Sequence, residues 1–238
     1  MIRVYFILLF SITLSINITS AQTRFAFITG YNSSFYTKPL HHISILYHDF
    51  NSRNSNYDKF LSHSWLNHGI ILGCRIEESE DDNGGFVLFW SNKHAKTTAE
   101  GFNLTDSADW KHKVKHRFNV LSMGLYFHPN KKNAMLKNME FGGSVDFGNF
   151  KVFKKQGPAD SFKDSSYVKV YDKNAFTMGI SLWATCRINS FLLLKGTCQT
   201  AFPLYTLRMK TEMDIDYKYF YRFHNITIAL IARLGSSF

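Results

Sequence analysis

Apolar and polar residues alternate along the segment 139–150. Its odd positions are apolar residues or glycine, whereas its even positions include Glu140 and Asp146. A period of two residues predicts a β-strand with one apolar and one polar face. In a soluble sheet the apolar face packs into a core, but in a membrane barrel it faces lipid and the polar face lines the lumen.

Similar alternation recurs along the chain and predicts eight strands. We expect them near 24–31, 67–77, 86–98, 113–128, 136–153, 168–188, 191–207 and 217–234. In the last of these the apolar parity changes, which predicts a bulge near His224–Asn225. Strands of about 10 to 20 residues suit a tilted membrane crossing with an extension beyond it, and exceed the usual strand length.

The gaps between the expected strands alternate in length. Long gaps fall at 32–66, 100–112, 154–167 and 208–216, and short gaps fall at 78–83, 129–135 and 189–190. Long external loops, short periplasmic turns and an even strand number are typical of outer-membrane barrels. The pattern therefore predicts an all-β fold, an eight-stranded antiparallel up-and-down transmembrane β-barrel. In the first long gap, 43–50 and 57–65 are candidates for an extra strand and a short helix.

Charged residues fall on the polar parity of these strands. They are Arg75, Glu77, Glu140, Asp146, Arg187, Lys195 and Arg233. A small barrel has a lumen filled by side chains, so we predict that these residues form a lumen charge network with opposite charges paired and strand glycines making room. Two alternatives are charges on the wet face of a soluble sheet and a soluble lipocalin-like barrel. The second requires an apolar interior parity, whereas this parity is charged.

The first 21 residues have the organisation of a secretory signal peptide. Arg3 precedes an apolar run from Val4 to Ile16, and Thr19-Ser20-Ala21 fits a cleavage site with small residues. As an uncleaved anchor the run would be short for a spanning helix, and no later stretch reaches the ~18 apolar residues that such a helix requires. We expect cleavage after Ala21, a barrel domain at 22–238 and location in a bacterial outer membrane.

The three cysteines that follow are Cys74, Cys186 and Cys198. An odd number cannot all pair. Cys186 and Cys198 are not equidistant from the turn at 189–190, so we predict no disulfide across it. All three share the apolar parity of their strands, where cysteine behaves as a small hydrophobic residue.

Near the end of the chain, Leu230 and Leu234 occupy apolar positions of the alternating pattern, and the last residue is Phe238. With this ending, the chain layout and the sequence Ser20-Ala21-Gln22, the protein resembles small outer-membrane β-barrel proteins of the Bacteroidota type, with eight-stranded barrels like OmpA and OmpX. The resemblance covers about residues 23–238 by pattern and not by an invariant motif. It implies that Leu230, Leu234 and Phe238 form a signal contacted by the barrel-assembly machinery.

Catalytic motifs are absent from the sequence: it has no nucleotide-binding glycine loop, zinc-type spacing or serine-hydrolase elbow. Histidines and an aspartate gather in and beside the first long gap: His41, His42, His48, Asp49, His63 and His68. They could bind a metal or pair with a carboxylate, so the alternative function is a barrel enzyme acting on lipid or peptide at the rim. No nucleophile at a diagnostic spacing accompanies them. We therefore expect no enzymatic activity, catalytic residue, cofactor or metal.

The chain has 28 Lys and Arg against 18 Asp and Glu. The basic residues include Lys93, Lys96, Lys111, Lys113, Lys115, Lys131, Lys132, Lys154 and Lys155. Several of them lie at strand ends, where cations could contact lipid phosphates or lipopolysaccharide. Since no nucleic-acid module is recognisable, we expect no nucleic-acid partner. The predicted function is a structural or interaction role through external loops, with outer-membrane lipid, lipopolysaccharide and envelope proteins as partners.

Overall fold

The computed structural model describes residues 23–36, 66–78, 84–103, 107–129, 136–170, 175–204, 207–210, 216–219 and 223–235. Every regular element in these ranges is a β-strand. The strands are β1 (Thr23–Tyr36), β2 (Leu66–Glu78), β3 (Gly84–Asn103), β4 (Ala108–Phe127), β5 (Met139–Pro158), β6 (Val168–Lys169), β7 (Ala175–Arg187), β8 (Leu192–Pro203), β9 (Leu207–Lys210), β10 (Asp216–Tyr219) and β11 (Phe223–Gly235). Within the same ranges, no helix is long and apolar enough to cross a membrane.

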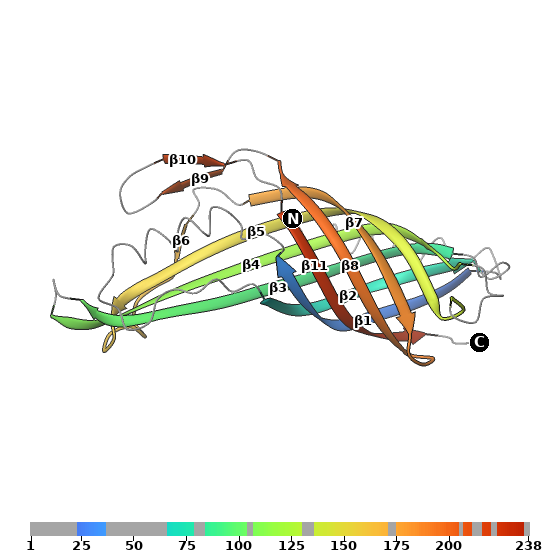
Figure 1. Cartoon of the computed structure of the whole chain (residues 1–238), viewed down its shortest axis with the longest axis horizontal. Coiled ribbons are helices and arrows are strands. Elements are labelled where there is room, and N and C mark those ends of the chain that lie inside the picture. The colour runs from blue at the N-terminus through green and yellow to red at the C-terminus, as the bar shows by residue number, and fades with distance from the viewer. Residues whose placement is uncertain are drawn as a thin grey trace.

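The strands close into a barrel (Figure 1). The order is β4-β3-β2-β1-β11-β8-β7-β5, and a further pairing of β4 with β5 completes the ring. All these pairings are antiparallel, and chain neighbours are ring neighbours once the short strands are set aside. The fold is thus an eight-stranded up-and-down barrel, as the alternation predicts.

The structure differs from the expected strands in three places. The expected long gap at 100–112 is reduced to 104–107, because β3 runs to Asn103 and β4 begins at Ala108, and β5 continues to Pro158 into the expected gap at 154–167. The expected strand at 168–188 is two elements, because β6 pairs only with Phe153 and Lys154 of β5 and β7 begins at Ala175. Residues expected at the start of the last strand form β10, which pairs with β9 in a separate hairpin. The predicted extra strand and helix at 43–50 and 57–65 fall outside the described residues.

The predicted bulge at His224–Asn225 is wrong. The pairing of β11 with β8 runs without interruption from Phe223 opposite Ala201 to Ala232 opposite Leu192. The parity change has another cause: Tyr217 and Tyr219 belong to β10, whereas Ile226 and Ile228 belong to the ring. Two strands had been interpreted as one.

The two faces of the ring are inverted relative to a soluble protein. Along β7, Ile180 is 60 % exposed whereas its neighbour Ser181 is 4 % exposed, and this alternation holds along most of the strand. The interior therefore holds polar and charged side chains beside buried apolar ones such as Phe89, Trp183 and Leu193, whereas the large side chains on the outward face are apolar. The three cysteines are free thiols, and Cys186 and Cys198 lie on this outward face.

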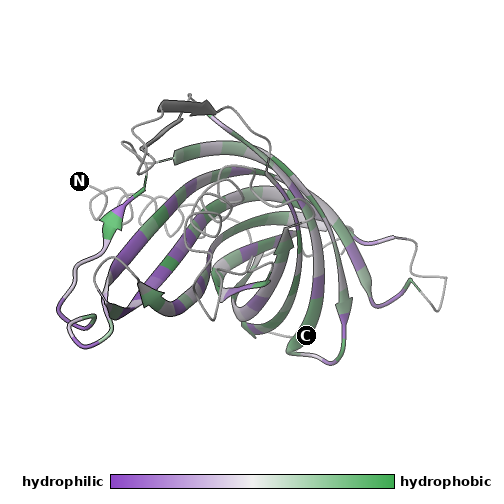
Figure 2. Cartoon of the chain, turned by 60° about the vertical axis from the view of Figure 1, so that its left-hand side comes forward, coloured by the Kyte–Doolittle hydropathy of each residue, from purple (hydrophilic) through white to green (hydrophobic). Residues whose placement is uncertain are grey.

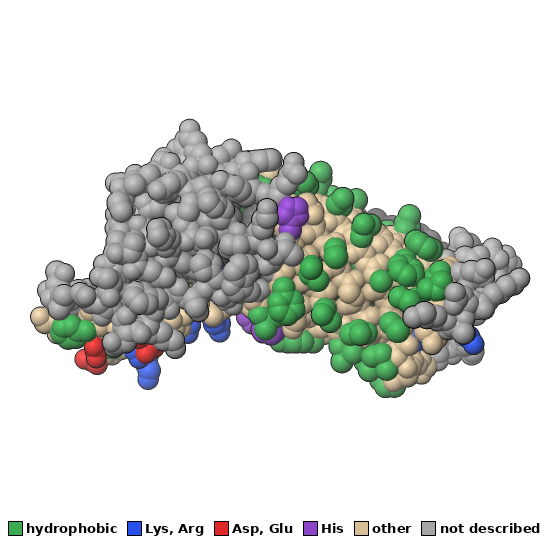
Figure 3. Space-filling view, viewed as in Figure 1, with side chains coloured by type: hydrophobic (Ala, Val, Ile, Leu, Met, Phe, Trp, Pro, Cys, Tyr) green, Lys and Arg blue, Asp and Glu red, His purple; other side chains and the backbone are tan. Residues whose placement is uncertain are grey.

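Outward-facing apolar side chains surround the ring, and we call them the apolar belt (Figure 3). Every ring strand contributes: Phe27, Tyr31 and Phe35; Ile70 and Leu72; Phe86; Met123, Leu125 and Phe127; Val145 and Phe147; Phe176, Met178, Ile180 and Leu182; Leu194; and Ile226, Ile228, Leu230 and Leu234. Large apolar side chains exposed in this number mark a surface that is covered in its native setting.

Three strands continue beyond the belt. β3, β4 and β5 have 20 residues each, whereas the other ring strands have 12 to 14. Figure 1 shows these three running far past their neighbours, and Figure 2 shows hydrophilic residues along them. We call residues 92–103, 108–119 and 149–158 the extension. Its outward side chains include Lys96, Arg117 and Lys151 in place of the belt's aliphatic and aromatic groups.

Candidate functional site in the lumen

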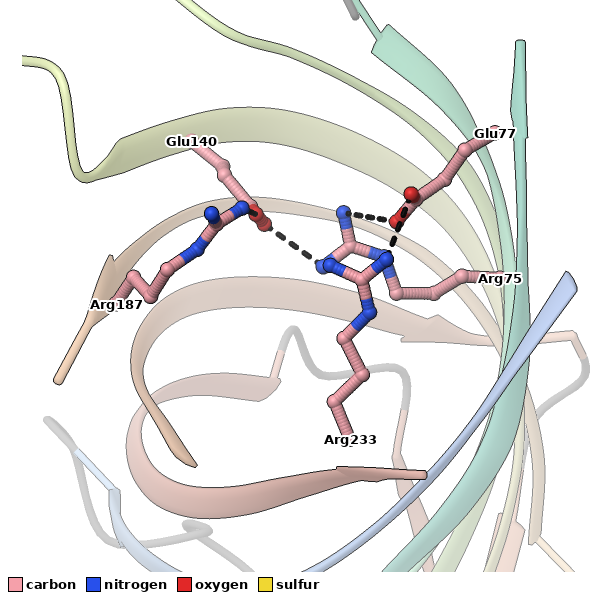
Figure 4. Close-up of polar contacts among 5 residues, drawn as sticks. All are labelled: Arg75, Glu77, Glu140, Arg187 and Arg233. Carbon is pink, nitrogen blue, oxygen red and sulfur yellow. Dashed lines mark hydrogen bonds and ion pairs between the residues drawn. The ribbon is translucent and has the colours of Figure 1, made fainter. Parts of the chain in front are cut away.

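A cluster of arginines and glutamates closes the lumen at the end where the short turns lie (Figure 4). Arg75 Nη1 donates a hydrogen bond to Glu140 Oε2 at 2.9 Å, and Arg75 Nη2 lies 3.3 Å from Glu77 Oε1. Arg233 Nη2 donates to Glu77 Oε2 at 2.7 Å. Arg187 Nη2 lies 3.9 Å from Glu140 Oε1. These five residues from β2, β5, β7 and β11 form the guanidinium–carboxylate cluster.

Burial makes the centre of this cluster energetically sensitive. Glu140 is 2 % exposed and Arg75 is 4 % exposed, whereas the Arg187 side chain is 42 % exposed at the rim. A charge in a low-dielectric interior is stable only with a partner, so each of the two buried residues depends on the other. The guanidinium carbon of Arg75 also lies 4.1 Å from the centre of the Tyr126 ring, a cation–π contact.

Asp146 lies apart from this cluster and is held by neutral donors. Its carboxylate accepts hydrogen bonds from Ser144 Oγ at 3.0 Å, from Ser181 Oγ and from Gln199 Nε2. The other end of the Gln199 amide, Oε1, faces Lys93 Nζ at 3.4 Å. A neutral amide thus links a buried carboxylate to a buried ammonium.

Lys93 reaches into the lumen and does not lie at a membrane surface. Its Nζ donates to Thr227 Oγ1 at 2.9 Å and to Asn225 Oδ1 at 3.2 Å, and the residue is 4 % exposed. Lys93 is therefore not one of the lysines that could contact lipid phosphates. The alternation along β3 explains why Lys93 points into the lumen, because Phe89, Ser91 and Lys93 occupy successive inward positions of the strand.

Lys195 makes aromatic contacts in the middle of the lumen. Its Nζ lies 3.7 Å from the centre of the Phe89 ring and 4.2 Å from that of Trp183. A small cavity reaches Lys93 on one side, and a second cavity reaches Arg75 on the other. Phe89 and Lys195 line both cavities, so this pair forms the partition between them.

The inward glycines make room for rings and neighbouring backbone. A Cβ at Gly142 would overlap the Trp183 indole, and one at Gly148 would meet the Phe118 ring. At Gly124 and Gly179, the contacts would be with Ser144 and with the backbone of the adjacent strand. The expectation that glycines clear space for charged side chains therefore needs correction, because none of these four contacts involves one.

In the structure, the seven charged residues of the predicted network do not form one network. Five of them meet in the guanidinium–carboxylate cluster, whereas Asp146 and Lys195 lie in separate surroundings of hydroxyl, amide and aromatic groups. Sequence reasoning missed two lumen residues, Lys93 and Tyr126, which are 4 % and 3 % exposed. The inward parity of β3 and β4 was the signal that could have found both.

The predicted histidine group is only partly visible. His41, His42, His48, Asp49 and His63 lie outside the described residues. His68 Nδ1 lies 3.1 Å from Ser33 Oγ, and its ring stacks on Tyr31. Across the described ranges, no group of three or more His, Cys, Asp or Glu side chains is placed to hold a metal ion. Of the assembly-signal residues, Leu230 and Leu234 face outward on β11, and Phe238 is not among the described residues.

Comparisons with known proteins find likeness in solved structures alone. No protein-family model and no curated protein matches the sequence. A crystal structure of Ail, the attachment invasion locus protein of Yersinia pestis, is 10 % identical and has a TM-score of 0.45, covering 90 % of this chain and 99 % of that one. A major outer membrane protein from Thermus thermophilus is 10 % identical, with a TM-score of 0.42 and coverage of 89 % and 99 %. Outer Membrane Protein W of E. coli is 10 % identical, with a TM-score of 0.39 and coverage of 91 % and 100 %. At such similarity the fold assignment rests on the strand pairing described above.

His116 is a buried titratable group in the extension. Its inward-facing ring lies beside Phe150 and is 4 % exposed, and neither ring nitrogen has a hydrogen-bond partner among the described residues. The outward neighbours Lys115 and Arg117 are charged, which places this level beyond the apolar belt. Burial lowers the pKa of His116 to about 4, because the charged ring would lose its hydration.

We expect the His116 ring to remain neutral throughout the mildly acidic range. Since its folded pKa lies below the unfolded value near 6.5, the neutral form favours folding. The contribution is complete above about pH 6.5 and is lost as the pH falls toward 4. Imidazole NMR signals recorded between pH 4 and 7 provide the measurement. A His116 midpoint near 6.5 would show that the ring is solvated and the packing is wrong.

Proposed function

We propose that this protein is an outer-membrane β-barrel of a bacterial cell envelope, exported by a cleaved signal peptide, with a side-chain-filled lumen and a structural or interaction role. The apolar belt carries the proposal. Every ring strand turns large apolar side chains outward, and the interior holds buried Arg, Lys, Glu and Asp. This is the face assignment of a barrel in lipid, where hydrocarbon covers the outside.

The content of the lumen supports an interaction role over transport. Eight-stranded barrels have interiors just wide enough for side chains to fill, whereas larger barrels enclose aqueous channels. Here the guanidinium–carboxylate cluster and the Phe89–Lys195 partition occupy successive levels of the lumen. Partners would then bind to the segments beyond the belt, which include the extension at the end of the barrel where the long loops lie.

The proposed partners follow from these surfaces. Outer-membrane lipid contacts the belt, and lipopolysaccharide contacts the cationic outward face of the extension. The barrel-assembly machinery reads the outward-facing Leu230 and Leu234 together with Phe238, and envelope proteins bind through the external segments. The proposal includes no nucleic-acid partner, enzymatic activity or cofactor.

Membrane fractionation combined with gel mobility tests the proposal. We expect the mature protein in the outer-membrane fraction, migrating as a compact species in detergent until it is boiled. The same sample after boiling is the internal control, because both lanes contain the same mass of chain. Recovery in the soluble fraction, with equal mobility before and after boiling, would contradict the proposal.

A further inference from the structure

Lysine and arginine side chains lie opposite one another on adjacent strands, on the outward face of the extension. On β4, Lys113, Lys115 and Arg117 occupy successive outward positions. In the strand pairing, Lys96 of β3 lies opposite Lys115, and Lys151 of β5 lies opposite Arg117. We call these five residues the basic ladder.

The ladder begins just past the apolar belt. Trp90, Leu121 and Phe147 form one outward row across β3, β4 and β5, and the next outward row is Asn92, Asn119 and Asn149. Asn92 Nδ2 donates to Asn119 Oδ1 at 2.7 Å within that row. The row after the asparagines holds His94 together with Arg117 and Lys151, and these last two are the first cations of the ladder. Apolar, amide and cationic rows thus follow one another on one continuous face.

Without a counter-ion this arrangement is unfavourable. Neighbouring strands lie about 4.8 Å apart, and like charges directly opposite on adjacent strands are destabilising. No ladder side chain has a carboxylate within ion-pair distance in the part of the chain that is described; the nearby pair of Lys111 and Glu100 at 3.8 Å lies farther out on the extension. The pKa of Lys115 is lowered by partial burial and then by Arg117, Lys96 and Lys113.

We propose that the basic ladder binds the phosphate groups of lipid A, the anionic lipid of the outer leaflet; this rests on the proposed function. The level of the ladder favours lipid over a soluble polyanion. Its side chains project from the same face as the belt, in the plane of the membrane, at the height where headgroups begin. Arg and Lys form charge-assisted hydrogen bonds to phosphate oxygens, and bound phosphates would relieve the repulsion within the ladder.

A binding titration tests this site directly. The protein is folded in a neutral glucoside detergent, which contains no phosphate, and titrated with diphosphoryl lipid A, with dephosphorylated lipid A, with inorganic phosphate and with a heparin fragment. The ladder variant is Lys115→Gln with Arg117→Gln. The matched control is Lys137→Gln with Lys163→Gln, which removes the same charge from two exposed positions that are not part of the ladder.

We expect the ladder variant to bind diphosphoryl lipid A about thirtyfold more weakly, since each cation near an anionic surface contributes about fivefold. The control variant should bind like the wild type, and dephosphorylated lipid A should bind weakly to all three proteins. Lys96→Gln with Lys151→Gln, which leaves β4 intact, should show a comparable loss and guards against misfolding of the first variant.

Three results would overturn the inference. These are equal losses in the ladder and control variants, equal binding of dephosphorylated lipid A, and preferential binding of the heparin fragment or of inorganic phosphate. Heat-modifiable mobility of each protein is measured in parallel. A wild type that is compact until boiled but does not discriminate between the lipids refutes the ladder site alone, whereas a wild type without a mobility shift refutes the proposed function as well.

Discussion

Replacing Glu140 with leucine is expected to destabilise the barrel by about 3–5 kcal/mol, because the substitution leaves Arg75 as a buried charge without its closest partner. In the native protein the two side chains meet at 2.9 Å in a nearly solvent-free site, and Glu77 lies farther from the same guanidinium at 3.3 Å. Reversible urea unfolding in lipid vesicles, followed by tryptophan fluorescence, measures the loss as a lower midpoint.

Arg187→Gln is the matched control for Glu140→Leu. Its guanidinium is 3.9 Å from the same carboxylate but 42 % exposed, so its removal should cost less than about 1 kcal/mol. The double variant Arg75→Leu/Glu140→Leu should recover much of the loss, since replacing a buried ion pair by apolar groups is often near neutral. Equal losses for Glu140→Leu and Arg187→Gln would mean that the lumen is hydrated and the pair is screened.

Alternation along the strands was enough to predict the ring, because side-chain direction in a strand depends only on parity. Segment 139–150 illustrates this: Glu140 and Asp146 point inward, whereas Val145 and Phe147 point outward. Local pattern does not specify which strand a residue pairs with. Tyr217 and Tyr219 continue the alternation of a long strand, yet they pair with β9 in a hairpin of their own.

The contacts within the lumen could not be predicted from the sequence, for a related reason. Parity places Glu140, Asp146 and Lys195 inside, but their heights depend on the stagger between strands, which the sequence does not state. Asp146 is therefore matched with Ser181 and Gln199, and Lys195 with the Phe89 and Trp183 rings. An inward charge was assumed to require an opposite charge, whereas amides, hydroxyls and aromatic faces also solvate buried ions.

The second large effect is expected on the outer face. Ile180 lies on β7 within the apolar belt, where its side chain is 60 % exposed on the protein surface. If hydrocarbon covers that surface, Ile180→Arg should destabilise the folded barrel by about 2–4 kcal/mol, the cost of an arginine near the bilayer midplane. Urea unfolding in vesicles again gives the measurement.

Phe102→Arg is the control for Ile180→Arg, because Phe102 is 44 % exposed at an outward position of β3 in the extension, beyond the belt and opposite Asp109 of β4. There the arginine would meet water or headgroups and should change the free energy of unfolding by no more than about 1 kcal/mol. In a soluble barrel both arginines would lie in water, and surface substitutions usually stay within about 0.5 kcal/mol. The difference in the free energy of unfolding between the two variants therefore distinguishes a membrane barrel from a soluble one. A large difference requires lipid around β7, whereas equal stabilities would mean that something other than a bilayer covers the apolar belt.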